Sequence, residues 1–396
     1  MKWCQSFCGR CDLTYDVIIL GAGINGCGIA QALSEDGQKV LVLDKGVIGG
    51  GTSSKSSRLI HGGLRYLETM RFGLVREALR DRLELLRQYP DLVEMRPFFL
   101  PIYKTSPRPA WMLWVGVKLY DVLAGWENKY RSGFVNRDAF EKDFSALKQD
   151  GVVNVLKYYD GKTNDWALTR RVAEDAKALG CVFCEQVDVA GLSWNEQGFE
   201  VRVGEEVYRS RKLVNATGPW IDEVVAQHQL PARFQIRKIS GIHIFIEGLL
   251  TPEPMFLQAH GKRIFFIIPE PENGHTMIGT TEREEGVGID DVDVQEADVD
   301  YLLEQVNAYL KSDRQIRRED VVDASVGVRP LVANKEDPTD LSREYELDLH
   351  TKGDTQLLNI FGGKLTTYLS LAQHVVKVLK GKRKKEKGKG KNKIPA

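Results

Sequence analysis

Residues 15–45 read YDVIILGAGINGCGIAQALSEDGQKVLVLDK, and this stretch decides the fold. Its apolar run Val17–Leu20 predicts a buried parallel strand, and a helix is expected from about Ile24 to Ser34. A second apolar run at 40–43 predicts another strand, which ends at Asp44. Strand, glycines, helix, strand and acid in this order predict a dinucleotide-binding βαβ unit.

Each glycine of the G-x-G-x-x-G pattern has a physical task. Gly21 permits the tight turn, Gly23 lets backbone approach a pyrophosphate, and Gly26 lets the helix pack closely on the strand. The helix N-terminus offers N–H groups and partial positive charge to phosphates. Asp44 is placed to accept hydrogen bonds from a ribose diol.

The composition is that of an ordinary globular protein with room for two subdomains, at 396 residues, 42% apolar and 28% charged. The 55 basic residues equal the 55 acidic ones, so no overall field favours nucleic acid. Ten basic residues lie between Lys377 and Lys393, which predicts a disordered basic end.

Six cysteines without a recognisable signal peptide indicate a reducing cytosol. Two C-x-x-C pairs, Cys8 with Cys11 and Cys181 with Cys184, lie far apart in the sequence. No cluster of His or Cys accompanies them, so free thiols are favoured over a redox or metal site.

Residues 49–67, GGGTSSKSSRLIHGGLRYL, offer backbone N–H groups, hydroxyls and cations to a phosphate or cofactor. Glycines beside His61, Arg65 and Tyr66 suggest backbone packed against a flat ligand. Residues 72–88 follow with the spacing of an amphipathic helix.

The aromatic segment 107–126, PRPAWMLWVGVKLYDVLAGW, is too short and too interrupted to span a membrane. It is either a core helix of the second subdomain, which is favoured, or a face that enters the lipid interface.

Three later segments repeat the theme of a strand that ends in a turn. They are RKLVNATGPW at 211–220, GVRP at 327–330, which is expected to be a strand-end turn presenting Arg329, and LLNIFGGKLTT at 357–367. In nucleotide-binding sheets the carboxyl ends of strands gather ligand contacts. From the residues alone, a core histidine is the favoured interpretation of His243 on its apolar strand, and an ordinary surface ion pair is an alternative for Arg329.

Together the motifs resemble the FAD-dependent glycerol-3-phosphate dehydrogenases of the D-amino-acid-oxidase superfamily. The residues that carry the resemblance are GAGINGCG, TSSKSSRLIHGGLRYLE, RPAW, LVNATGPW, GIHI, GTT, SVGVRPL and FGGKLTTY, in this order along nearly the whole chain. Typical members continue into a helical C-terminal domain, which this sequence is expected to lack, and Arg58 stands where lysine is expected.

The resemblance implies an α/β fold of the glutathione-reductase type, with an inserted substrate domain on a mixed or antiparallel sheet. We therefore expect a disordered leader at 1–13, a discontinuous FAD-binding domain at 14–93, 150–235 and 321–379, a substrate domain at 94–149 and 236–320, and a basic disordered tail at 380–396.

The resemblance further implies which residues bind FAD. They are Gly21, Gly23, Ile24, Asn25, Gly26, Asp44, Lys45, Thr52, Ser53, Ser54, His61, Gly62, Gly63, Leu64, Val187, Ala216, Thr217, Gly218, Gly362, Gly363, Lys364, Leu365 and Thr366.

The implied reaction oxidises sn-glycerol 3-phosphate at C2 to dihydroxyacetone phosphate, with hydride transfer to flavin N5. The substrate contacts are expected from Arg65, Tyr66, His243, Arg329, Arg343 and Lys364. His243 is the expected base, and Arg65 and Arg329 are expected to stabilise the developing alkoxide. No metal is expected.

A quinone is the implied electron acceptor, and the expected location is cytoplasmic and peripheral on the inner face of the cytoplasmic membrane. The resemblance also allows for a homodimer. The alternatives are an oxidase that uses O₂, an amine oxidase of the same fold, and a flavin-binding relative without turnover. An NAD-binding protein with a nucleic-acid-binding tail is disfavoured because no aromatic residue interrupts that tail.

Overall fold

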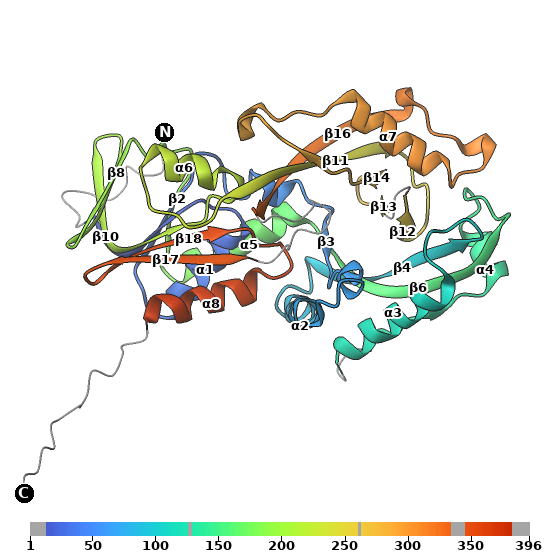
Figure 1. The fold of residues 1–396 in the computed structure, drawn as a ribbon, viewed down its shortest axis with the longest axis horizontal. Helices are drawn as coiled ribbons and strands as arrows, with labels where there is room; N and C mark the ends of the chain where they lie inside the picture. Colours follow the sequence, from blue (N-terminus) through green and yellow to red (C-terminus); the bar gives the residue numbers. More distant parts are fainter. Residues whose placement is uncertain (1–12, 126–128, 260–262, 334–344, 382–396) are drawn as a thin grey trace, which may run out of the picture.

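Two β-sheets form the framework of the protein in the computed structural model, which describes residues 13–125, 129–259, 263–333 and 345–381 (Figure 1). Nearly all of the expected leader and tail lies outside these ranges, and so do Arg343, Cys8 and Cys11.

The first sheet contains the dinucleotide-binding unit, with strand order β17-β18-β10-β1-β2-β7. From β18 to β7 all neighbours are parallel, whereas β17 and the β8–β9 hairpin are attached antiparallel. The expected α/β class with a Rossmann-type parallel sheet is confirmed. The strands are β1 (Thr14–Leu20), β2 (Val40–Leu43), β7 (Val182–Cys184), β8 (Gly191–Asn195), β9 (Gly198–Val203), β10 (Glu206–Asn215), β17 (Glu346–Lys352) and β18 (Thr355–Phe361).

Strand β1 shows why this sheet is apolar on both faces. Val17 and Ile19 belong to the core shared with the helices α1, α5 and α8, whereas Ile18 and Leu20 belong to the core on the opposite face. All four side chains are buried. Successive side chains of a strand point to opposite faces, so a continuous apolar run suits a sheet covered on both sides.

The second sheet is almost entirely antiparallel, with order β15-β11-β14-β13-β12-β4-β6-β3, and β16 and β5 pair with β11 and β6. Only β12 and β4 are parallel among its described pairs. Its strands are β3 (Leu59–Ile60), β4 (Val93–Tyr103), β5 (Gly133–Phe134), β6 (Val152–Thr163), β11 (Ile236–Glu247), β12 (Met255–Gln258), β13 (Ile264–Glu270), β14 (His275–Gly279), β15 (Arg283–Glu284) and β16 (Val321–Val332).

The helices cover the two sheets on different sides. In Figure 1, α7 lies above the second sheet and α3 lies below it. Leu302 and Val306 of α7 pack with Ile242 and Ile244, and Leu113 of α3 belongs to the core on the other face. The helices are α1 (Ile24–Glu35), α2 (Phe72–Gln88), α3 (Ala110–Leu123), α4 (Arg137–Asp143), α5 (Asp165–Ala178), α6 (Ile221–Gln227), α7 (Glu296–Asn307) and α8 (Tyr368–Lys380).

The domain boundaries given by the sequence stay a prediction. Strands β6 and β16 fall within the ranges expected for the FAD-binding domain, but both pair in the second sheet. Each sheet is therefore built from strands that come from several separate parts of the chain. Among the described residues, no helix is long and apolar enough to cross a bilayer.

Helix α1 packs against α8 without space for a side chain at Gly28, where an added Cβ would overlap the ring of Tyr368. We therefore expect Gly28→Ala to lower the free energy of unfolding by about 1–3 kcal/mol, because overpacking forces neighbours to move. The shift of the urea midpoint measures this. Gly116→Ala on α3 is the matched control, since an added Cβ there meets nothing within 4 Å and helix propensity favours alanine. An equal loss in both variants would contradict the packing argument.

Candidate active site

A cavity of about 690 Å³ collects nearly all the residues that the sequence predicts for cofactor and substrate. It is lined by the ends of parallel strands of the first sheet and by β11 and β16 of the second. The predicted residues on its wall are Gly21, Gly23, Ile24, Asn25, Asp44, Lys45, Thr52, Ser53, His61, Gly63, Leu64, Arg65, Tyr66, Val187, Ala216, Thr217, Gly218, His243, Arg329, Gly362, Gly363, Lys364, Leu365 and Thr366.

Gly26, Ser54 and Gly62 are the predicted residues in the described ranges that do not line this wall. An added Cβ at Gly26 would overlap the carbonyl oxygen of Gly21, so Gly26 acts by letting α1 approach the turn. The Ser54 hydroxyl donates to the carbonyl oxygens of its own turn, Gly50 and Gly51.

The turn after β1 has the geometry that a pyrophosphate requires. Gly21 has φ +97°, and a Cβ on it would lie 2.6 Å from the carbonyl oxygen of Ala216. Only glycine adopts this conformation in this space at low cost. The N-terminus of α1 consequently faces the cavity, where its dipole and N–H groups favour an anion.

Asp44 is held at the carboxyl end of β2 by two backbone donors. Ala22 N donates to Oδ2 at 2.5 Å, and Gly46 N donates to Oδ1 at 2.7 Å. Lys45 turns away toward Asp290, with 2.7 Å between Nζ and Oδ2. The acid of the fingerprint is thus fixed on the cavity wall, as a ribose contact requires.

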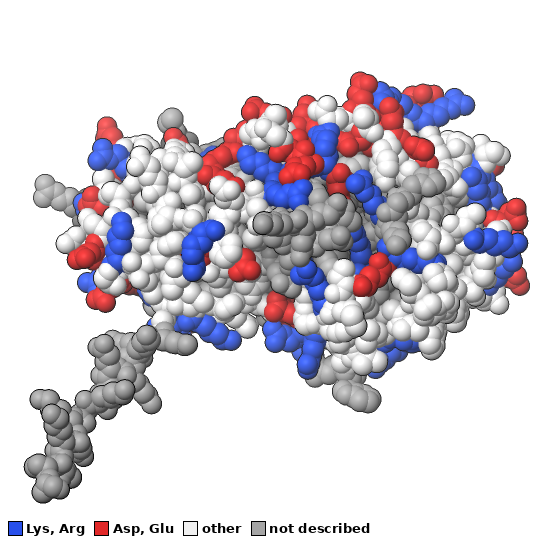
Figure 2. Space-filling view, viewed as in Figure 1, with Lys and Arg blue, Asp and Glu red and all other residues white. Residues whose placement is uncertain are grey.

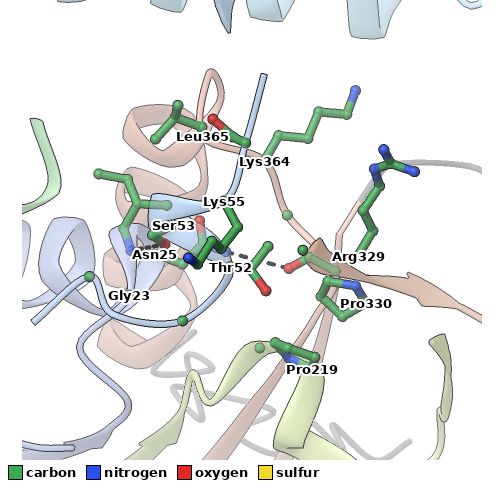
Figure 3. A pocket seen from close by; sticks show the side chains of 18 of the residues that line it. Gly23, Asn25, Thr52, Ser53, Lys55, Pro219, Arg329, Pro330, Lys364 and Leu365 are labelled. Carbon is green, nitrogen blue, oxygen red and sulfur yellow. Dashed lines mark hydrogen bonds between the residues drawn. The ribbon is translucent and has the colours of Figure 1, made fainter. Parts of the chain in front are cut away.

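The loop between β2 and β3 closes over the N-terminus of α1. The Ile24 N–H donates to Ser53 Oγ at 2.9 Å, and the Thr52 hydroxyl donates to the Val328 carbonyl at 2.7 Å. Figure 3 shows Thr52 and Ser53 between Asn25 and the strand that carries Arg329. This loop therefore joins the two sheets at the cavity.

The His61–Gly63 segment is supported from behind by a buried polar group. Gly62 N donates to Tyr120 Oη at 2.7 Å, and that hydroxyl donates to Asp160 Oδ1 at 2.7 Å. Asp160 also pairs with the buried Arg82 at 2.6 Å. Burial raises the pKa of the Asp160 carboxyl, and the guanidinium opposes this effect. Gly62 thus positions its neighbours rather than lining the cavity.

The turn Gly362–Lys364 forms the wall opposite the loop. Both glycines have positive φ, +83° and +98°. The Asn25 amide donates to the Gly362 carbonyl at 3.4 Å, but its Oδ1 atom is buried without a hydrogen-bond partner in the described structure. Buried polar atoms usually have a hydrogen-bond partner. The unpaired Asn25 Oδ1 atom beside the cavity therefore fits a ligand that donates a hydrogen bond to it.

The register of the second sheet brings His243 and Arg329 to one side. His243 pairs with Ser325, Gly241 pairs with Gly327, and Ile239 pairs with Arg329 across β11 and β16. Opposed residues and every second residue share a face. The interpretation of 327–330 as a strand-end turn is wrong, because β16 continues through it to Val332.

Cations gather at this end of the cavity. Arg329 donates to Thr280 Oγ1 at 2.8 Å, and Lys364 Nζ lies 4.3 Å from the centre of the Tyr66 ring. Figure 3 shows the Lys364 and Arg329 side chains extending on the same side of the cavity. With Arg65 on the same wall, the group suits a small anionic substrate.

His243 is 3% exposed, and its Nε2 atom lies 2.9 Å from Ser57 Oγ. Burial, together with the positive charges of Arg329 and Arg58, lowers the pKa of the imidazole from its ordinary value of 6.5 to about 3. The ring is therefore neutral at physiological pH, which a proton acceptor requires.

Sequence reasoning missed several wall residues, among them Ser57 and Gly241. An added Cβ at Gly241 would overlap the Arg329 guanidinium, so this glycine provides the space for it. The serine-rich run 53–57 was a visible signal for Ser57, whereas the role of Gly241 depends on strand pairing that no local pattern reveals.

The sequence is similar to those of known flavin enzymes. The model of the FAD dependent oxidoreductase family, DAO, matches residues 16–354. A D-erythritol 1-phosphate dehydrogenase from Brucella abortus is 35% identical, covering 93% of this chain and 74% of the relative. The aerobic glycerol-3-phosphate dehydrogenase of Escherichia coli is also 35% identical, with coverages of 92% and 73%.

Solved structures agree with the fold. A Bacillus halodurans glycerol-3-phosphate dehydrogenase complexed with FAD has a TM-score of 0.73 at 21% identity, and the match covers 92% of this chain and 64% of that one. This chain therefore spans less than two thirds of that structure. The expected resemblance and the expected cofactor are confirmed: the chain belongs to the FAD-dependent oxidoreductase family, and FAD is its cofactor.

Proposed function

We propose that this protein oxidises sn-glycerol 3-phosphate at C2 to dihydroxyacetone phosphate. The observation that carries the proposal is the group of cations Arg65, Arg329 and Lys364 beside a neutral buried histidine, in the same cavity as the FAD cradle. The relatives named as glycerol-3-phosphate dehydrogenases support this substrate class.

The residues have distinct roles in this reaction. Arg329 and Lys364 bind the phosphate, since guanidinium and ammonium groups pair with its oxygens. Arg65 favours negative charge on the C2 oxygen as its proton leaves. His243 takes that proton. FAD, held by the Gly21–Gly26 turn, Asp44 and the Gly362–Lys364 turn, supplies the hydride acceptor.

D-Erythritol 1-phosphate is the second candidate substrate, because the Brucella abortus relative named for it matches 93% of this chain. It shares the phosphate and a secondary alcohol with glycerol 3-phosphate. The same cations and the same base therefore serve either substrate, and the difference lies in the room for a longer polyol.

We further propose that the protein meets a membrane surface and passes electrons to a quinone there. On α3, Trp111 and Val122 are each 71% exposed, Trp114 40% and Val115 49%. Their spacing puts them on one helix face. Figure 2 shows a largely uncharged surface at the lower right, over the place of α3 in Figure 1. The helix thus has one core face and one open face. Because tryptophan favours the membrane interface, we propose that the open face is the one that meets lipid.

The first test is anaerobic reduction of the bound flavin. Sn-glycerol 3-phosphate should bleach the oxidised flavin, and inorganic phosphate or glycine should not. Arg329→Met should weaken substrate binding by about 1.5–3 kcal/mol, which is roughly 10- to 150-fold in the substrate concentration for half-maximal reduction. Arg317→Met is the matched control, because Arg317 is 76% exposed and pairs with Glu319 at 3.4 Å.

The same assay separates the alternatives. Faster bleaching by D-erythritol 1-phosphate would assign the second substrate, and bleaching by neither phosphate would contradict the proposed function. Rapid recolouring in air without quinone would indicate an oxidase.

The buried imidazole should stay neutral across the physiological range. Because its pKa is lowered from 6.5 to about 3, protonation between these values is opposed in the folded protein. The stability that neutral His243 contributes is thus complete above pH 6.5 and is lost as pH falls toward 3. Histidine NMR of the substrate-free holoenzyme, with the His243→Gln variant for assignment, should show no titration of this ring from pH 8 to pH 5. A midpoint near 6.5 would contradict the buried, cation-flanked site.

Membrane contact should depend on the open face of α3. The double variant Trp111→Ser with Trp114→Ser should lower binding to phosphatidylglycerol vesicles at least tenfold, because each buried large side chain contributes about 1.5–3 kcal/mol. Cosedimentation measures this, and flavin reduction in solution should be unchanged. Leu249→Ser is the control, since Leu249 is 49% exposed elsewhere. Equal binding of wild type and double variant would exclude this face.

A further inference from the structure

The base predicted from the sequence lines the cavity from a buried position, with one ring nitrogen facing a hydroxyl group. His243 is 3% exposed, and its Nε2 atom is 2.9 Å from the hydroxyl oxygen of Ser57. On another side of the ring Gly279 packs closely, because a Cβ added to Gly279 would overlap the Cδ2 atom of His243. Strand β11 and its neighbours therefore fix the ring in place, with Nε2 directed at Ser57.

Ser57 itself lies on the cavity wall and is more exposed than His243. It belongs to the loop that joins the two sheets. In this loop the hydroxyl of its neighbour Ser56 donates to Asp165 Oδ2, with 2.7 Å between the two oxygen atoms. On the other side of Ser57, the Arg58 guanidinium pairs with the buried Glu270. The two flanking contacts fix the backbone on both sides of Ser57, whose hydroxyl lies on the cavity wall beside the imidazole.

We propose that Ser57 is a further catalytic residue, which relays the alcohol proton of the substrate to His243. The inference rests on the proposed function. A serine hydroxyl can accept one proton while it donates its own, so Ser57 can pass a proton from the cavity to the Nε2 atom that it faces at 2.9 Å.

The proton and the hydride of the secondary alcohol leave to different acceptors. The substrate O–H bond breaks and its proton goes to Ser57 Oγ, while the original Ser57 proton moves to His243 Nε2. The C2–H bond breaks with its electron pair, which goes to FAD as hydride, and the C2–O bond becomes a carbonyl. His243 ends as a cation, Ser57 is unchanged, and the substrate has lost two electrons to FAD.

The relay requires one particular form of the neutral imidazole. Nε2 must carry the lone pair that accepts the Ser57 proton, so the ring proton must be on Nδ1. The reverse arrangement, with Nε2–H donating to Ser57, would leave no acceptor facing the hydroxyl. The tautomer is therefore a direct readout of the proposal that needs no substrate.

Two measurements on the holoenzyme test the relay. First, ¹⁵N NMR of His243 should show Nε2 as the unprotonated nitrogen. Second, Ser57→Ala should slow anaerobic flavin reduction by glycerol 3-phosphate about 10²–10⁴-fold, the usual contribution of a proton-transfer group. FAD content and the substrate concentration for half-maximal reduction should stay near those of wild type, and Ser57→Thr, which keeps a hydroxyl, should restore most of the rate.

Ser240→Ala is the matched control, since Ser240 is a buried serine of β11 whose hydroxyl donates to the Arg283 carbonyl away from the cavity. The bound flavin of the Ser240→Ala variant should be reduced at the wild-type rate. Three outcomes would each overturn the relay. They are flavin reduction at the wild-type rate in Ser57→Ala, slower reduction in this variant that a loss of FAD or of substrate affinity accounts for, and a proton on Nε2 of His243. If wild type itself is not reduced by either sugar-alcohol phosphate, the proposed function fails, whereas the tautomer still decides whether Ser57 donates to His243.

Discussion

A close approach of backbone segments at the first turn of α1 controls the geometry of the site. A Cβ at Gly26 would overlap the Gly21 carbonyl, and one at Gly21 would lie 2.6 Å from the Ala216 carbonyl. These two glycines let α1 start directly at the ends of β1 and β10. The helix N-terminus and the strand ends then share one space, which is why phosphate-binding groups and Asp44 meet there.

A single loop, residues 44–58, contacts both the N-terminus of α1 and the second sheet. The Thr52 hydroxyl donates to the Val328 carbonyl at 2.7 Å, and a Cβ on Gly327 would lie 2.6 Å from the Lys55 carbonyl. Ser57 then reaches His243 on β11. The loop that closes over the cofactor cradle is thus the same loop that contacts the proposed proton acceptor. One short segment therefore contacts the cofactor cradle, the strand that carries Arg329 and His243.

Much of this could be predicted from the sequence where the pattern is local. The expected helix of residues 72–88 is α2, with the bounds Phe72–Gln88, because amphipathic spacing specifies it within one element. The role of Gly241 could not be predicted, since it arises from strand pairing with Gly327, 86 positions further along the chain, which no short window of sequence contains. For the same reason, the segment around Arg329 was expected to be a turn but continues as a strand.

The charges around His243 link binding to chemistry. Its pKa of about 3 reflects burial first and then the Arg329 and Arg58 cations. The buried carboxylate of Glu270 opposes the charge of Arg58. The carboxylate of Glu282 is more distant from its partner, with 4.0 Å between its Oε1 atom and Arg329. A phosphate dianion beside Arg329 would offset the positive field that makes the imidazole a weak base. The substrate would therefore raise the basicity of the group that must take its proton, and an empty site would keep that group neutral and unreactive.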